Sequence, residues 1–254
     1  MAAISAHRGG GEEAPAGTYQ AYVGALEAGA DYVEFDIRRT ADGELAVYHD
    51  NHVGHDNASG HNALAHISYS GLCELAGYEV PRVADLMRLI AGHAIGHLDL
   101  KETGGEEAVI EQALDILGPG RFVTTTLEDA SVAAIKGRFP DVPVGLSLGR
   151  DLGAVPRLLR PLARRREVFP LSRIRACGAD WVAMHQGLAL AGVLRRCRRQ
   201  GIKTMIWTVN NDTMITRWLA DPWVDVLVTD RPKHAITSRE RLRGAPGPAK
   251  PRGS

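Results

Sequence analysis

Ala6-His7-Arg8-Gly9 is the first of several places in this chain where an apolar, strand-like run ends in polar side chains. It follows the apolar residues 2–6, which predict a short first strand that ends in polar side chains. The same arrangement recurs along the chain. The polar or aromatic residues on or just after predicted strand ends are His7, Arg8, Glu34, Asp36, His49, Asp99, Lys101 and Trp207. If the strands are parallel, these side chains gather on one face of the molecule.

Strand-like and helix-like segments alternate about eight times between residues 2 and 235. This alternation predicts an α/β fold, a single-domain (β/α)8 TIM barrel over residues 1–240. Residues 241–254 are rich in Gly, Pro, Lys and Arg, and we expect a disordered tail there. A doubly wound sheet is the alternative, but it normally needs a GxGxxG turn that opens a helix, and Gly9-Gly10-Gly11 lacks that pattern.

The predicted elements follow from hydrophobic period and from helix-ending signals, such as Thr18 as a cap and Gly29 as a stop. The expected strands are residues 2–6, 31–38, 44–48, 93–101, 122–126, 142–148, 180–184, 202–209 and 224–229. The expected helices are residues 19–28, 82–91, 106–117, 128–138, 154–177, 189–200 and 213–220. Residues 51–70 are polar, Gly-rich and His-rich, and we interpret them as a long loop over the strand ends.

Composition and charge narrow the class of protein. The chain is 44% hydrophobic and 24% charged, which is ordinary for a globular protein, and its zero net charge gives no overall attraction to nucleic acid. Cys73, Cys177 and Cys197 lie far apart without a CxxC or zinc spacing, which favours a reducing compartment. The start shows no secretory leader pattern, and no apolar stretch approaches ~18 residues. We expect a cytoplasmic protein without a transmembrane segment.

A carboxylate pair marks a candidate metal site. Glu34 and Asp36 are two residues apart in an apolar strand, so both side chains leave the same face. Burying them costs several kcal/mol each unless a cation compensates them. The alternative is that this face is exposed to solvent. Asp99 and Lys101 repeat the spacing on another predicted strand, which favours metal binding.

Together with the carboxylates, two histidines and an arginine provide the groups needed for metal-assisted attack on a phosphate ester. His7 and His49 could serve as acid and base, and Arg8 could fork onto phosphate oxygens. A lone histidine is more often structural, so their joint placement at strand ends carries the hypothesis. Trp207 could be a core residue or an apolar wall for the substrate.

Other polar clusters are less specific. A second metal site on the His-rich segment is disfavoured because no HExxH pattern is present; its histidines are His52, His55, His61 and His66. Cys73 is best explained as a packed small residue. A basic run comprises Arg157, Arg160, Arg164, Arg165 and Arg166. It could be a solvated helix face or a peripheral contact with an anionic membrane surface.

The chain resembles the glycerophosphodiester phosphodiesterases over roughly residues 3–235. The matching segments are HRGGGEEAPAGT, GADYVEFDIRRTADGELAVYHD, VPRVADLM, LDLKE, IWTVNN and VDVLVTDRP. The resemblance implies a TIM barrel with one divalent cation, Mg²⁺ or Ca²⁺, that cleaves glycerophosphodiesters to glycerol 3-phosphate and an alcohol. It implies catalytic roles for His7 and His49, phosphate or substrate binding by Arg8, Lys101 and Trp207, and metal ligation by Glu34, Asp36 and Asp99.

Two positions depart from the family pattern. Ala16 stands where the family usually has Glu, in a PENT segment that here reads Pro15-Ala16-Gly17-Thr18, and Asp99 replaces the usual Glu. Two alternatives therefore stay open beside a soluble glycerophosphodiesterase. One is a lysophospholipase D or sphingomyelinase D-like enzyme; the other is a phosphodiester-binding barrel recruited to other chemistry with weakened hydrolysis.

Overall fold

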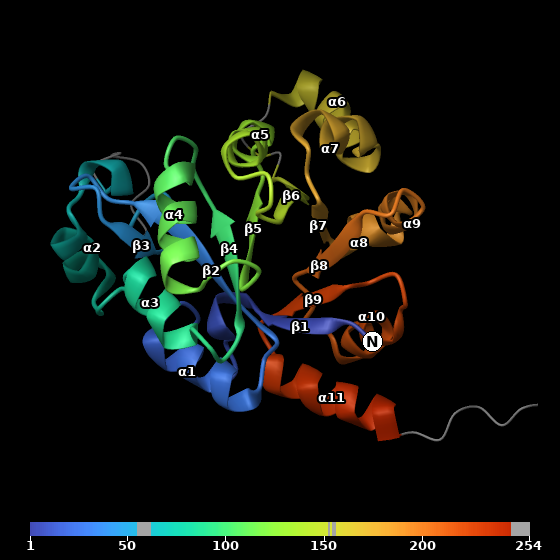
Figure 1. The fold of residues 1–254 in the computed structure, drawn as a ribbon, viewed down its shortest axis with the longest axis horizontal. Coiled ribbons are helices and arrows are strands. Elements are labelled where there is room, and N and C mark those ends of the chain that lie inside the picture. Colours follow the sequence, from blue (N-terminus) through green and yellow to red (C-terminus); the bar gives the residue numbers. More distant parts are fainter. Residues whose placement is uncertain (55–61, 152, 154–155, 245–254) are drawn as a thin grey trace, which may run out of the picture.

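The computed structural model describes residues 1–54, 62–151, 153 and 156–244. Its centre is a closed barrel of eight parallel strands with helices around it (Figure 1). The barrel strands are β1 (Ala3–Ala6), β2 (Tyr32–Arg39), β4 (Ile95–Leu100), β5 (Phe122–Thr126), β6 (Val144–Leu148), β7 (Trp181–His185), β8 (Lys203–Trp207) and β9 (Val226–Thr229). The short β3 (Leu45–Val47) pairs antiparallel with β2 at the rim. The predicted single-domain TIM-barrel fold is confirmed.

The barrel closes because β1 pairs with the second strand and with the last. Ala6 lies opposite Val33 of β2 on one side and opposite Thr229 of β9 on the other. The next pairing places Asp36 of β2 beside Asp99 of β4. The strand ends that carry His7, Glu34, Asp36 and Asp99 are therefore neighbours in one ring.

The main helices pack around the outside of the barrel (Figure 1). They are α1 (Tyr19–Ala28), α3 (Val83–Ile90), α4 (Glu106–Ile116), α5 (Asp129–Arg138), α7 (Leu171–Cys177), α9 (Val193–Arg198), α10 (Asp212–Ala220) and α11 (Pro232–Gly244). The predicted ends of α1 are confirmed, because the Thr18 hydroxyl accepts a hydrogen bond from Ala21 N–H and Gly29 adopts the left-handed conformation. Among the described helices, none is long and apolar enough to span a bilayer.

The barrel interior is filled rather than open. Inward-facing side chains from β5, β7, β8 and β9 form an apolar plug of Val123, Trp181, Ala183, Met205, Val226 and Val228. The alternate residues of the same strands, such as Val182 and Met184, pack outward against the helices. The plug closes the lower barrel, so polar side chains at the carboxyl ends of the strands have an apolar floor.

The prediction of one long loop over residues 51–70 is wrong in its second half. A 3-10 turn, η2 (Leu64–His66), is followed by α2 (Tyr69–Ala76), which the sequence did not predict. The Ser68 hydroxyl caps α2 by accepting from Gly71 N–H, and Leu64 and Leu72 are buried in a small separate core with Val53. Residues 55–61 lie outside the described part of the chain.

Other boundaries also differ. The helical segment predicted over residues 154–177 is divided into η3 (Arg157–Leu159), α6 (Arg160–Val168) and α7. The helix predicted over residues 189–200 is α8 (Gln186–Leu190) followed by α9, with left-handed Gly192 between them. The helix α11 was not predicted; it begins at Pro232, where proline is well tolerated, and includes residues 241–244 of the expected tail. The rest of that tail lies outside the described residues.

Candidate active site

A cavity of about 370 Å³ opens at the carboxyl ends of the barrel strands. Seven of the eight residues that the sequence singled out line it: His7, Arg8, Glu34, His49, Asp99, Lys101 and Trp207. Asp36 lines a smaller adjoining cavity that shares Arg8 and His49 as walls. The structure therefore brings all of the predicted site residues together.

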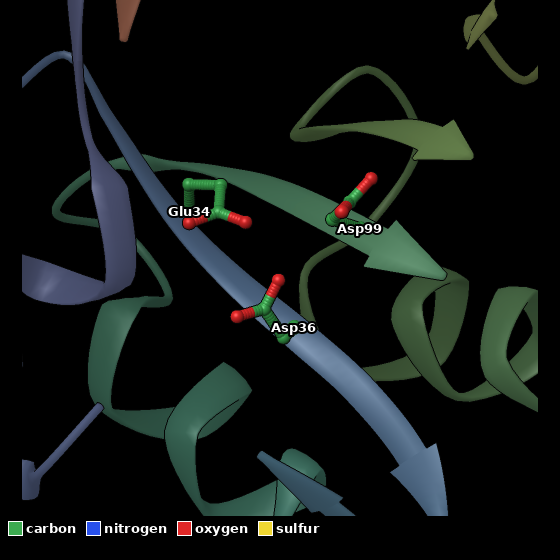
Figure 2. A group of neighbouring side chains, drawn as sticks. All are labelled: Glu34, Asp36 and Asp99. Carbon is green, nitrogen blue, oxygen red and sulfur yellow. The ribbon is translucent and has the colours of Figure 1, made fainter. Parts of the chain in front are cut away.

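Three carboxylates from two adjacent strands lie close together beside these cavities, and Figure 2 shows their side chains on the two strands. Glu34 and Asp36 come from β2 and Asp99 from β4, and one oxygen from each lies within 4.8 Å of the others. Only 3% of Glu34 and 2% of Asp36 is exposed, so this strand face is not a solvated one. Burial and the neighbouring Asp36 raise the pKa of Glu34 to about 8.

Two cations compensate part of this negative charge. Lys101 Nζ lies 2.8 Å from Asp36 Oδ1 and also pairs with Asp99, while Arg8 Nε lies 2.9 Å from Asp36 Oδ2. Burial opposes ionisation of Asp36, but Lys101 and Arg8 outweigh it and lower the pKa of this carboxyl. Within the part of the chain that the structure describes, Glu34 accepts one hydrogen bond, from the Arg8 backbone N–H at 2.8 Å. Three oxygen donors with one poorly compensated carboxylate fit a hard divalent cation.

Arg8 reaches this position through an unusual backbone. Its φ and ψ are 50° and 35°, and it is the one non-glycine residue of the described chain with positive φ. Gly9 follows in the same region, and a Cβ there would lie 2.8 Å from Ala21 and Tyr22 of α1. A left-handed arginine costs of order 1–3 kcal/mol, and such strain concentrates at functional sites. Here it directs the Arg8 backbone N–H to Glu34 and the guanidinium to Asp36.

His7 is held by a residue at the far end of the chain. Its Nδ1 lies 2.6 Å from Asp230 Oδ1, and Asn210 Nδ2 donates to the other oxygen of Asp230 at 2.5 Å. Burial opposes protonation of His7, but the negative charges of Glu34 and Asp230 outweigh it and raise the pKa of His7. Burial also works against ionisation of Asp230, but the bond to His7 prevails and lowers the pKa of this carboxyl. An ionised Asp230 can only accept, so Nδ1 of His7 carries the hydrogen.

His49 has a different environment. Its Nδ1 lies 2.6 Å from Asp50 Oδ1, the neighbouring residue in the sequence. Burial lowers the pKa of His49, and this effect exceeds the opposing attraction to Asp36. The pKa values of His7 and His49 are thus shifted in opposite directions, which suits a pair that shares acid and base roles.

A buried hydrogen-bonded chain supports Asp99. Thr125 Oγ1 donates to Asp99 Oδ1 at 2.6 Å, so its lone pair accepts from His97 Nε2 at 3.0 Å. His97 Nδ1 then accepts from the Ser5 hydroxyl at 3.1 Å. Burial lowers the pKa of His97 to about 4, which keeps the ring neutral. This chain fixes the orientation of the short Asp99 side chain.

The opposite wall of the cavity is aromatic. Trp207 meets the ring of His185 edge to face, with ring centroids 5.6 Å apart. Gly149 makes this packing possible, because a Cβ there would lie 2.7 Å from His185 and 3.3 Å from Trp207. Trp207 is therefore a wall of the cavity as well as a packed residue.

The comparisons with known proteins agree with this geometry. The model of the "Glycerophosphoryl diester phosphodiesterase family" matches residues 7–90. A glycerophosphodiester phosphodiesterase of Caldanaerobacter subterraneus subsp. tengcongensis is 24% identical, with 92% of this chain and 96% of the relative covered. One of Bacillus altitudinis is 25% identical, with 96% and 100% covered. The chain is thus similar to the glycerophosphodiester phosphodiesterase family by its model over residues 7–90 and to these relatives over most of its length.

Solved structures resemble this chain over nearly its whole length. A putative glycerophosphoryl diester phosphodiesterase from Agrobacterium tumefaciens superposes with a TM-score of 0.76 at 22% identity, covering 96% of this chain and 100% of the other. A phosphodiesterase from Oleispira antarctica, solved in complex with the product sn-glycerol-3-phosphate, gives 0.69 at 15% identity, covering 94% and 96%. At these identities the likeness concerns the fold.

Ala16, which stands where the resemblance predicts a glutamate, lies beside the site. Ala16 and Gly17 line the smaller cavity together with Arg8 and His49. The nearby Glu12 and Glu13 do not replace the missing carboxylate, because they pair with Arg231 and Lys233 on the α11 side.

Three polar residues of the site were missed by sequence reasoning: Asn210, Asp230 and His97. Asp230 follows β9 and Asn210 follows β8 closely, so the strand-end rule that selected His7 would have selected them too. His97 shares a face with Asp99, two residues away on β4.

The described histidines of the segment 51–70, His52 and His66, do not line the active-site cavity. His52 pairs with Asn51, His66 is exposed on η2, and His55 and His61 lie outside the described residues. Where the chain is described, the carboxylates of Glu34, Asp36 and Asp99 form the one cluster with metal-ligand geometry. Cys73 packs against the small core next to β3, as predicted for a small packed residue.

Proposed function

We propose that this protein is a metal-dependent phosphodiesterase that hydrolyses glycerophosphodiesters to glycerol 3-phosphate and an alcohol. One observation carries the proposal: the imidazoles of His7 and His49 line the same cavity as Glu34 and Asp99, which form a three-carboxylate cluster with the buried Asp36. The names of the relatives support the substrate class, and the Oleispira antarctica phosphodiesterase with bound sn-glycerol-3-phosphate supports the product.

Glu34, Asp36 and Asp99 would hold one divalent cation, Mg²⁺ or Ca²⁺. When bound, the cation supplies positive charge for the phosphate oxygens of the substrate. The raised pKa of Glu34 supports this assignment, because burial and the neighbouring Asp36 both disfavour its charged form, and a bound cation would offset both effects.

Arg8 and Lys101 are the phosphate-binding groups of the proposal. Both are cations on the cavity wall, and both already lie next to Asp36, so they present positive charge without further rearrangement. Trp207, on the opposite wall, gives the organic part of the substrate an apolar surface.

His7 and His49 share the proton transfers. One takes the proton of the attacking hydroxyl, and the other protonates the departing alcohol oxygen as its P–O bond breaks. Where the attacking hydroxyl is that of the glycerol moiety, the product is a cyclic phosphate, and water opens it with the two roles exchanged. Asp230 holds Nδ1–H of His7, which leaves Nε2 to exchange the proton.

The test is hydrolysis of glycerophosphocholine and lysophosphatidylcholine, each with Mg²⁺, Ca²⁺ or EDTA, with release of glycerol 3-phosphate as one readout. Chelator-sensitive release from glycerophosphocholine, lost in His7→Ala and His49→Ala but kept in His66→Ala, is the expected result. Turnover of only the lysolipid would favour the lysophospholipase D or sphingomyelinase D-like alternative. No turnover with any metal would leave a phosphodiester-binding barrel in which Ala16 marks the change of function.

A further inference from the structure

The segment that follows β6 exposes leucines beside arginines. We call η3 and α6, residues 157–168, the arginine-leucine segment. Leu158 is 94% exposed, Leu159 53% and Leu162 55%, an unusual exposure for three leucines within five residues. Figure 1 shows α6 at the outer edge of the molecule, away from the barrel axis. Clustered exposed apolar side chains are typical of interaction surfaces and not of a helix face that contacts only water.

The charge of the arginine-leucine segment is strongly positive. It holds five arginines: Arg157, Arg160, Arg164, Arg165 and Arg166. Its one carboxylate, Glu167, is buried and directed inward, where it accepts from Arg150 N–H and from Arg164. Phe169 follows this segment and is also exposed, and the Arg196 guanidinium lies 4.7 Å from the centre of its ring. We call the exposed surface of the segment and Phe169 the patch.

The arginine-leucine segment is attached to the rim of the active-site cavity. Gly149, Arg150 and Asp151 at the end of β6 line that cavity. The 3.1 Å hydrogen bond from Arg150 N–H to Glu167 Oε1 fastens α6 to this rim. Whatever binds the segment therefore lies next to the cavity mouth.

From this combination we infer that the arginine-leucine segment docks the protein on an anionic lipid surface, with the cavity mouth next to the bilayer. Anionic head groups attract clustered arginines, and the acyl boundary takes up leucines that water would leave exposed. The positive charge of the patch favours an anionic lipid surface over a neutral apolar partner. The inference does not need the proposed hydrolysis, because binding is measured separately.

The experiment is co-sedimentation of the full chain with sucrose-loaded vesicles. One set is phosphatidylcholine alone and the other is phosphatidylcholine mixed with phosphatidylglycerol. We expect binding to the anionic vesicles, much less to the neutral ones, and a loss of binding as salt rises. Replacing Arg157 and Arg165 with Gln should lower the partition coefficient roughly fivefold per arginine. Leu158→Ser with Leu162→Ser should lower it on the order of tenfold.

Matched controls change the same residue types elsewhere. Leu75→Ser removes an exposed leucine of α2, and Arg241→Gln with Arg243→Gln removes two exposed arginines from the last turn of α11. These variants should bind vesicles like the parent. The far-UV circular dichroism spectrum and the thermal unfolding midpoint of the Leu158/Leu162 variant should match those of the parent, which shows that the variant folds.

Three results would overturn the inference: no binding to anionic vesicles, equal binding to neutral and anionic vesicles, or equal binding by the patch and control variants. A concentration-dependent dimer that dissociates in the Leu158/Leu162 variant, without vesicle binding, would assign the patch to contact between copies of the chain. Vesicle binding by a chain that hydrolyses no phosphodiester would refute the proposed function and leave the docking surface standing.

Discussion

Asp230 Oδ1 lies 2.6 Å from Nδ1 of His7, and this hydrogen bond joins the ends of the last and first barrel strands across 223 positions of the sequence. The contact exists only because β1 pairs with β9. Since Asn210 holds the second oxygen of Asp230, the carboxylate cannot turn away from the imidazole. The closure of the barrel therefore sets the tautomer of His7.

Replacing this carboxylate tests its role. Asp230→Asn removes a negative charge that raises the pKa of His7, so the pKa of His7 should fall. The limb of the kcat/KM pH profile that reports His7 should move to lower pH, and kcat/KM at neutral pH should fall about 10²-fold. Asp115→Asn, at an exposed site on α4, is the matched control. An unchanged pH profile in Asp230→Asn would separate His7 from the proton transfers.

Glu34 should make the metal-free protein sensitive to pH. Its pKa is about 8 in the folded chain against an ordinary value of 4.5, so the folded state keeps a proton that the unfolded chain releases. The free energy of unfolding in EDTA should therefore fall as pH rises from about 5 to 8. Glu34→Gln should lessen this fall, as urea unfolding across that range would measure. A steeper dependence in Glu34→Gln would contradict the charge assignment.

Thr125 should act through Asp99. Thr125→Val removes the donor to Asp99 Oδ1 and should weaken divalent-cation affinity about 10- to 100-fold, measured by metal titration of activity and by calorimetry. Thr125→Ser should restore most of it. Thr124→Val is the control, because this neighbour on β5 is buried but its hydroxyl has no partner within the described chain. Equal effects of the two valine substitutions would indicate packing instead of positioning.

Arg8 combines a fork-shaped cation with a strained backbone. Arg8→Lys keeps the charge and the left-handed conformation but loses the planar fork, so kcat/KM should fall about 10²-fold. The free energy of unfolding should change by no more than about 1 kcal/mol, because Lys101 still pairs with Asp36. A large loss of stability with unchanged kcat/KM would make Arg8 a structural residue.

Helix-capping residues and the spacing of apolar residues correctly predicted the ends of some helices and strands and the side chains that share a strand face. The Thr18 cap and the left-handed Gly29 end α1 at the predicted residues, and β5 has the predicted bounds. The period-two spacing placed Glu34 and Asp36 on one strand face. Each of these features depends on neighbours within a few residues, and the pattern alone shows them.

The sequence pattern did not predict the contacts between segments that lie far apart in the chain. Asp230 was interpreted only as the end of a strand, because nothing nearby indicates its partner His7. His97 looked like one more residue of an apolar strand, although Thr125 on the next strand links it to Asp99. The helix α2 was missed because Leu72 becomes buried only in a small separate core with Ala46, Val53, Leu64 and Val80.

The pairing of β1 with β9 also has a consequence for the newly made chain. On the ribosome His7 emerges early, whereas the strand that completes the ring and Asp230, 223 positions after His7, are translated much later. Until then the chain carries the carboxylate pair and both imidazoles without the tether that orients His7. A nascent chain stalled before Val226 should therefore be inactive even where its early helices have formed, and activity should appear only when translation has passed Asp230.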